Sequence, residues 1–194
     1  TPPFSICVYC GSRAGVAEHF VRAAREVGRW IGERSGQLVY GGGNRGLMGT
    51  VATATLEAGG TVVGIIPRTL VDKEFAKREC TELHIVQSMH ERKHLMAERA
   101  GAFLALAGGI GTFEELFEVW TWRQLGYHDK PVGILDTEGY YQPMLQFLQG
   151  AVRQGFMNDW QMDLVRVGTD PAQLLQALVE ESRGPQQPQD LSKI

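Results

Sequence analysis

Cysteine is scarce in this chain, and no disulfide framework is expected. The 194 residues include only Cys7, Cys10 and Cys80, whereas small disulfide-stabilised domains carry a denser, even-numbered set. Cys7 and Cys10 have C-x-x-C spacing, but they fall where an apolar run ends, while redox pairs lie at a helix N-terminus. No second pair completes a zinc site, so we interpret both as ordinary thiols at the end of a strand.

Strong charge and long apolar runs are also missing. The formal net charge is -3, with acidic and basic residues interspersed, so neither a nucleic-acid partner nor a polybasic membrane contact is predicted. The longest apolar runs have the length of strands, and no charged segment leads into an apolar one at the N-terminus. We therefore expect no membrane span and no signal peptide, and a cytoplasmic location is the default.

Hydrophobic residues make up 43% of the chain, which is enough for one domain with a sizeable core. Short apolar runs alternate with segments of helical period, a pattern typical of an α/β, Rossmann-like fold with a doubly wound parallel sheet flanked by helices. We assign residues 1–182 to one such domain and predict that the polar tail, 183–194, is disordered. The predicted strands are 5–9, 37–40, 61–66, 83–86, 102–106, 132–135 and 164–167, and the predicted helices are 16–33, 47–58, 90–100, 112–124, 140–154 and 171–179.

Three of the predicted strands run directly into glycine. They are followed by Gly11-Ser12, by Gly-Gly-Gly-Asn-Arg-Gly at 41–46 and by Gly-Gly-Ile-Gly-Thr at 108–112. Ligands of open parallel sheets bind beyond the carboxyl ends of the strands, where glycine allows close approach and helix N-termini attract anions. Three such loops at one edge of the sheet predict a ligand that contains phosphate.

The segment 41–46 also fits the dinucleotide fingerprint Gly-x-Gly-x-x-Gly. The acidic residue that this fingerprint expects at the end of the next strand is missing, because that strand ends in Ile66-Pro67-Arg68. Arg68 could favour a 2′-phosphate, which leaves NADP as an open alternative. A P-loop is excluded, since no Gly-Lys-Ser/Thr follows the glycines.

A zinc-hydrolase signature occurs at His90-Glu91-x-x-His94. In that signature two histidines one helical turn apart hold the metal and the glutamate acts as a base. Glu114 lies about where some zinc peptidases keep a third ligand. The predicted strand 102–106 and a glycine loop separate Glu114 from the histidines, however, and this arrangement disfavours the zinc alternative.

The middle residues of the same signature are more informative. Arg92 and Lys93 fall in the first turn of a predicted helix, where a cation faces the positive end of the helix dipole. A bound anion would offset this cost, and so would a neighbouring carboxylate such as Glu114 or Glu115. Side chains that simply point into solvent are the alternative.

The predicted helix 112–124 opens with two adjacent acids. Thr112 and Glu115 fit a capping box, in which the glutamate reaches back to the first backbone N–H. Consecutive helical residues point about 100° apart, so Glu114 and Glu115 are expected to differ in role, one holding ligand and one carrying out chemistry. The helix is apolar on more than one side, which predicts packing against both its own sheet and a partner chain.

The segments 41–49, 89–93 and 108–115 together resemble the LOG family, cytokinin riboside 5′-monophosphate phosphoribohydrolases that were often labelled lysine decarboxylases. The similarity extends from Val8 to Tyr141. The resemblance implies a Rossmann-like homodimer that needs no cofactor. The resemblance also implies that this homodimer hydrolyses the N-glycosidic bond of AMP or an N6-prenylated AMP to free base and ribose 5-phosphate. No PLP lysine motif supports a decarboxylase, and a nucleotide-binding module without turnover is the non-enzymatic alternative.

Carried over residue by residue, the resemblance implies that Arg92 and Glu115 are catalytic. Ala107 stands where the family has proline, which predicts a looser glycine loop, and Gly101 stands where it usually has aspartate. No metal ligand is implied. The resemblance and the glycine loops together predict these substrate-binding residues: Gly11, Ser12, Gly42, Gly43, Glu74, Met89, Lys93, Gly108, Gly109, Gly111, Thr112, Glu114 and Thr121.

Overall fold

The computed structural model describes residues 1–185. Residues 186–194, most of the tail for which the sequence predicts disorder, lie outside the described residues. The strands are β1 Ser5–Tyr9, β2 Gln37–Tyr40, β3 Thr61–Pro67, β4 Glu82–Val86, β5 Ala102–Ala105, β6 Val132–Leu135 and β7 Val165–Gly168. The helices are α1 Glu18–Glu33, α2 Gly46–Glu57, α3 Met89–Arg99, α4 Ile110–Gln124, α5 Gln142–Arg153, α6 Asp159–Met162 and α7 Pro171–Ser182, with 3-10 turns η1 Arg68–Leu70 and η2 Thr137–Gly139.

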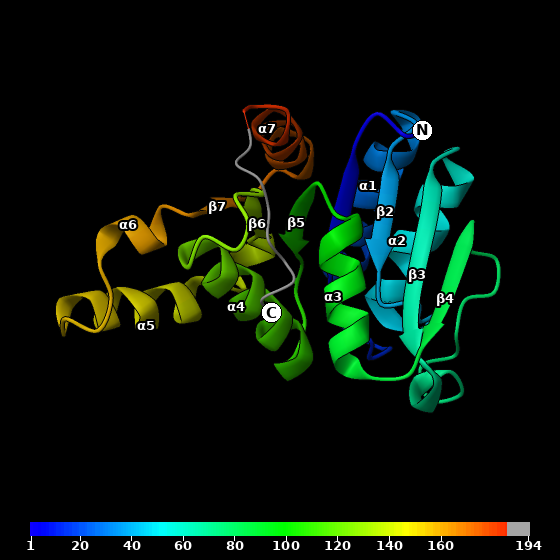
Figure 1. Ribbon diagram of the computed structural model, residues 1–194, viewed down its shortest axis with the longest axis horizontal. Coiled ribbons are helices and arrows are strands. Elements are labelled where there is room, and N and C mark those ends of the chain that lie inside the picture. The colour runs from blue at the N-terminus through cyan, green and yellow to red at the C-terminus, as the bar shows by residue number, and fades with distance from the viewer. Residues whose placement is uncertain (186–194) are drawn as a thin grey trace.

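The strands form one parallel sheet in the order β4-β3-β2-β1-β5-β6-β7. The chain builds outward from β1 to β4, crosses back, and then builds outward from β5 to β7 (Figure 1). The order reverses between β1 and β5, whose register pairs Ile6 with Ala102 and Tyr9 with Ala105. This is the doubly wound α/β fold predicted from the sequence, and its ligand site is expected beyond the carboxyl ends of these two strands.

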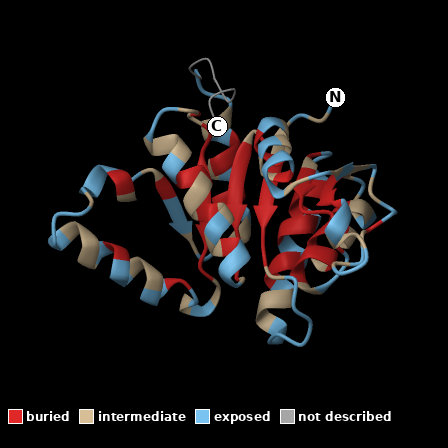
Figure 2. Ribbon diagram, turned by 60° about the horizontal axis from the view of Figure 1, so that its bottom comes forward, coloured by how far each residue is buried: buried red, intermediate tan, exposed pale blue. Residues whose placement is uncertain are grey.

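Helices cover both faces of the sheet because alternate strand residues point to opposite sides. On one face Ile6, Val8 and Cys10 pack with side chains from α1, α2 and α7. On the other face Cys7 and Tyr9 pack with side chains from α3, α4 and α5. The buried residues therefore form a continuous layer along the strands (Figure 2). None of the described helices combines the length and the apolar character that a bilayer span requires.

Most differences from the predicted elements are shifts of one or two residues. α1 begins at Glu18 and not at Val16, and the short α6, missed from the sequence, precedes β7. The consequential difference is α4, which begins at Ile110 with Gly109 as its N-cap. Thr112 therefore lies inside the first turn, and the predicted capping box is wrong. The glycines at 109 and 111, which sequence reasoning treats as loop formers, tolerate the helical start.

Candidate functional site

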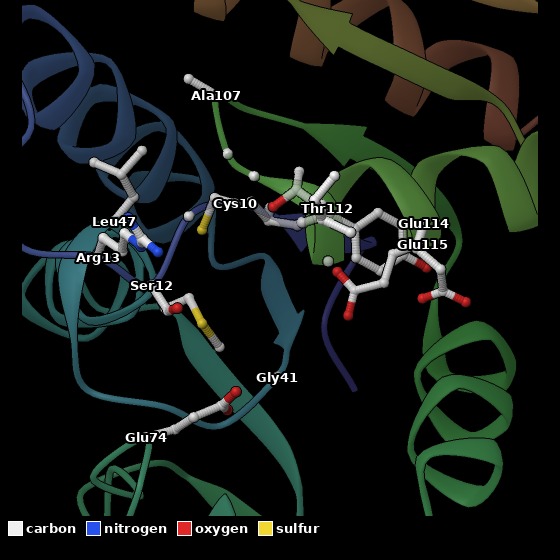
Figure 3. A pocket seen from close by; sticks show the side chains of 18 of the residues that line it. Cys10, Ser12, Arg13, Gly41, Leu47, Glu74, Ala107, Thr112, Glu114 and Glu115 are labelled. Carbon is white, nitrogen blue, oxygen red and sulfur yellow. The ribbon is translucent and has the colours of Figure 1, made fainter.

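A cavity of about 650 Å³ lies at the carboxyl ends of the strands, where the sheet order reverses. Its volume is within the range of small-molecule sites. Glycines from all three predicted loops contribute to its wall, and the labelled side chains come from segments far apart in the sequence (Figure 3). The predicted binding and catalytic residues that line it are Gly11, Ser12, Glu74, Met89, Arg92, Gly108, Gly109, Gly111, Thr112, Glu114 and Glu115.

The loop before α4 presents backbone amides to this cavity. Gly109 makes no side-chain cap, so the first N–H groups of the helix have no partner from a capping side chain. A Cβ at Gly108 would collide with the Thr112 side chain, which explains why glycine is needed there. These features leave the N-terminus of α4 suited to an anion.

Hydrogen bonds fasten the entry to this loop at three points. The Gly11 amide donates to the Ala107 carbonyl (3.0 Å). The Tyr140 hydroxyl donates to the Gly108 carbonyl (2.5 Å) and the Tyr141 hydroxyl to the Leu106 carbonyl (2.6 Å). The tyrosines thus hold the segment where the resemblance leads one to expect proline. Neither was singled out from the sequence, although the pair follows the sixth predicted strand.

Arg92 is buried, with 4% of its surface exposed. Its Nε donates to the Ile65 carbonyl (3.1 Å), and its Nη2 donates to the Gly41 carbonyl (2.7 Å) and to Glu74 Oε2 (3.0 Å). These partners lie beyond or near the carboxyl ends of β2 and β3. The solvent-exposed alternative is therefore wrong for Arg92, and the carboxylate that compensates its charge is Glu74.

Gly41 leaves the space that the Arg92 guanidinium occupies. A Cβ at this position would overlap Arg92 Nη2, so any other residue would displace the guanidinium. Gly42 and Gly43 instead join the loop to the segment that carries Glu74: the Lys77 amide donates to the Gly42 carbonyl (2.8 Å), and Gly43 forms an antiparallel bridge with Ala76. These contacts engage the backbone of the Gly-x-Gly-x-x-Gly segment within the protein itself.

Glu115 is half-buried on α4 and lines the cavity. Burial raises its pKa to about 7; the charge of Arg92 opposes this rise, and the charges of Glu114 and Glu74 add to it. Within the described residues its carboxylate accepts no hydrogen bond. A carboxylate with this pKa, free of structural partners and facing a cavity, is suited to exchange protons near neutral pH.

Glu114, the neighbouring acid, has different contacts from Glu115, as the angle of about 100° between consecutive helical residues predicts. Lys93 Nζ donates to Glu114 Oε1 (2.6 Å) and to Glu118 Oε2 (2.8 Å), joining α3 to α4. Burial alone would lower the pKa of Lys93, but these carboxylates outweigh it and raise the pKa. Neighbouring carboxylates therefore offset the charge of Lys93, which is one of the alternatives that the sequence predicts.

Four predicted binding residues lie outside the set that lines the cavity: Gly42, Gly43, Lys93 and Thr121. Gly42 and Gly43 contact the segment that carries Glu74, and Lys93 binds Glu114. Thr121 is exposed near the C-terminal end of α4. The cavity wall also includes Arg13, which sequence reasoning passed over although it follows Gly11-Ser12 directly.

The zinc-type signature has a local structural explanation. Ser88 caps α3 by accepting from the Glu91 amide (3.1 Å), and Glu91 Oε2 accepts from the Gln87 amide (2.7 Å). Glu91 therefore accepts a hydrogen bond from the backbone that precedes α3, which occupies the glutamate that a zinc hydrolase would use as base. His90 and His94 are exposed on α3. Within residues 1–185, no three His, Cys, Asp or Glu side chains are grouped as metal ligands would be.

The C-x-x-C pair is divided by the sheet. Cys7 packs on one face and Cys10 on the other, and both are free thiols. Burial raises the pKa of each thiol well above its usual range. Although Cys10 lines the cavity, it is a neutral thiol there and is unsuited to act as a nucleophile.

The fold and the site first define a class of protein, the doubly wound α/β proteins with a cavity where the strand order reverses. In this chain the cavity is lined by glycine loops, a buried arginine and a carboxylate of raised pKa. Residues 48–178 match the family model described as "Possible lysine decarboxylase". The chain belongs to this family, the LOG family of cytokinin riboside 5′-monophosphate phosphoribohydrolases, which confirms the resemblance read from its motifs.

Curated relatives cover most of the chain. "Probable cytokinin riboside 5′-monophosphate phosphoribohydrolase LOGL2" of Oryza sativa subsp. japonica is 43% identical over 97% of this chain and 77% of its own length. "Cytokinin riboside 5′-monophosphate phosphoribohydrolase LOG5" of Arabidopsis thaliana is 47% identical over 89% of this chain and 76% of its own length.

Solved structures of more distant proteins share the fold. The Moco carrier protein of Chlamydomonas reinhardtii superposes with a TM-score of 0.68 at 22% identity, covering 91% of this chain and 96% of the carrier. The molybdenum cofactor binding protein of Rippkaea orientalis superposes with a TM-score of 0.69 at 17% identity, covering 91% of this chain and 95% of that protein. At these identities the likeness concerns the fold alone.

Proposed function

We propose that this protein hydrolyses the N-glycosidic bond of purine nucleoside 5′-monophosphates that carry an amino group at C6, namely AMP or its N6-prenylated forms. The products are the free base and ribose 5-phosphate. The relatives named above support the reaction type. The observation that carries the proposal is Glu115, a carboxylate of raised pKa in a cavity that also offers free helix amides.

The phosphate is assigned to the amides of the 108–112 loop, where the helix N-terminus favours an anion. Glu115 follows Gly111 by one turn of α4, a separation of about 6 Å along the axis. A ribose held by its 5′-phosphate at the start of the helix therefore lies beside this carboxylate. Arg92, fixed by two carbonyls and Glu74, borders the same space.

Glu115 acts in its ionised form. As the bond between C1′ and the base nitrogen breaks, its electron pair leaves with the base and positive charge grows on the ribose ring. The carboxylate stabilises that charge and accepts a proton from the water whose oxygen bonds to C1′. The departing base takes up a proton from solvent and Glu115 returns its proton to solvent, so that neutral base and ribose 5-phosphate result. Arg92 lowers the pKa of Glu115 and so favours the ionised form.

The test is release of free base, followed by chromatography, from AMP and from N6-prenylated AMP. Wild type releases base, whereas Glu115→Gln abolishes release and still binds AMP. Glu98→Gln on α3 is the matched control, because Glu98 is exposed and lies outside the cavity wall. A nucleotide-binding module without turnover predicts AMP binding with no base released by any variant. Loss of activity on chelation together with stoichiometric zinc would favour the metal alternative.

We further propose that the protein works as a homodimer in the cytoplasm. The described part of the chain has free thiols only, as expected in a reducing compartment. α5 and α6 extend away from the body of the domain (Figures 1 and 2), and Phe147, Phe156 and Trp160 of this region are exposed. Thr121 matches a ligand-lining position but is exposed outside its own cavity, which supports its contribution to the site of a second copy.

A further inference from the structure

The charged side chains that line the cavity differ in whether each has a partner of opposite charge close by. Arg92 is paired with Glu74 at 3.0 Å. Two further carboxylates, Glu114 and Glu115, belong to the wall, and Glu114 is paired with Lys93 at 2.6 Å. Arg13 is the second cation among the lining residues. Within residues 1–185 no carboxylate lies within ion-pair distance of its guanidinium, so it is the uncompensated cation of the described cavity wall.

The backbone places Arg13 beside the loop that leads into α4. The amide of Gly11, two residues before Arg13, donates to the Ala107 carbonyl (3.0 Å), and this bond joins the two loops. A Cβ at Gly46 would lie 2.6 Å from the Arg13 carbonyl oxygen, so the second glycine loop packs directly against the backbone of Arg13. Figure 3 shows Arg13 on the side of the cavity opposite Glu114 and Glu115.

A nucleoside monophosphate brings about two negative charges into a cavity that already holds carboxylates. Helix amides offer partial positive charge only, and the charge of Arg92 is offset by Glu74. A free guanidinium at the mouth supplies the missing full charge and can bind phosphate oxygens in a forked geometry.

We infer that Arg13 is a substrate-binding residue that pairs with the 5′-phosphate and makes the site selective for nucleotides over nucleosides. This inference rests on the proposed function, since it identifies the residue that recognises one part of the proposed substrate. Its location at the exposed mouth also means that the contact forms early and is weakened by salt.

Calorimetry in the Glu115→Gln background tests the inference without turnover. Adding Arg13→Ala weakens AMP binding about tenfold, as expected for the loss of a charge-assisted contact, and leaves adenosine binding within about twofold. Arg13→Lys restores part of the AMP affinity. Arg29→Ala is the matched control, because Arg29 is exposed on α1 and does not line the cavity. Circular dichroism checks that each variant is folded.

Two results would overturn the role of Arg13: AMP affinity that is unchanged in Arg13→Ala, or equal weakening of AMP and adenosine. Failure of the proposed function is a separate outcome. If wild type releases no base but AMP binding still depends on Arg13, the hydrolase proposal fails and the phosphate contact stands. If base is released and AMP affinity does not depend on Arg13, the reaction stands and Arg13 has no part in it.

Discussion

At the scale of single residues, the proposed mechanism makes Glu115 the group that determines how activity depends on pH. Its pKa is raised to about 7, chiefly by burial, and the proposed mechanism requires its ionised form. We therefore expect kcat/KM for AMP to rise about tenfold per pH unit below pH 7 and to level off above it. Binding of AMP to Glu115→Gln across the same pH range controls for titration of the substrate phosphate. A rate that falls as pH rises through 7 would assign Glu115 the role of general acid.

The same residue links pH to stability. Because its folded pKa lies above its ordinary value near 4.5, its contribution to stability is fully present below about pH 4.5 and is lost as pH rises through 7. Glu115→Gln removes this dependence. Urea titrations at pH 5 and pH 8.5 measure the free energy of unfolding. Relative to wild type, that of the variant should increase by up to about 3 kcal/mol at the higher pH. An equal difference at both values would contradict burial as the source of the shift.

At the scale of elements, the loop after β2 positions Arg92. Gly41→Ala places a methyl group where Arg92 Nη2 lies, and a flexible side chain can yield more easily than backbone. The expected result is a loss of base release of about 100-fold or more, corresponding to about 3 kcal/mol of transition-state stabilisation, with only a small change in Tm. Gly150→Ala on α5 is the control, because its nearest atom lies at 3.7 Å. Full activity of Gly41→Ala would remove Arg92 from the mechanism.

The tyrosines after β6 support the loop before α4. Tyr140→Phe removes the hydrogen bond to the Gly108 carbonyl, and we expect the KM for AMP to rise several-fold because the amides that receive phosphate become less ordered. The change in kcat should be smaller. Tyr127→Phe is the matched control, since it removes a hydroxyl outside the cavity wall. A KM unchanged by Tyr140→Phe would mean that the remaining contacts of the loop suffice.

At the scale of the whole molecule, the region of α5 and α6 leaves the aromatic side chains of Phe147, Phe156 and Trp160 exposed on a single chain. Phe147→Asp on α5 puts a charge on an exposed aromatic position and should convert the proposed dimer to a monomer in sedimentation velocity experiments. Activity should fall with it, because Thr121 would no longer reach the site of a second copy. Ile85→Asp at the edge strand β4 is the control at the far side of the sheet. A wild-type monomer with full activity would contradict the proposed assembly.

The sequence predicts the sheet, its helices and the three glycine loops because strand and helix periods and glycine positions are local signals. The partners of Arg92 are not predictable in this way: they are the carbonyls of Gly41 and Ile65 and the carboxylate of Glu74, and only the fold brings them together. The predicted start of α4, residue 112, lies two residues after the observed one, because Gly111 is a weak helix former by propensity yet adopts the helix in context.

The central claim is that Glu115 carries out hydrolysis of a nucleotide bound in this cavity. The most direct measurement compares free adenine released from AMP by wild type and by Glu115→Gln, with AMP affinity of both proteins measured by calorimetry. The expected result is release by wild type only, with similar affinities. Release by both proteins would contradict the assigned role of Glu115, and release by neither, from AMP or its N6-prenylated form, would contradict the proposed function.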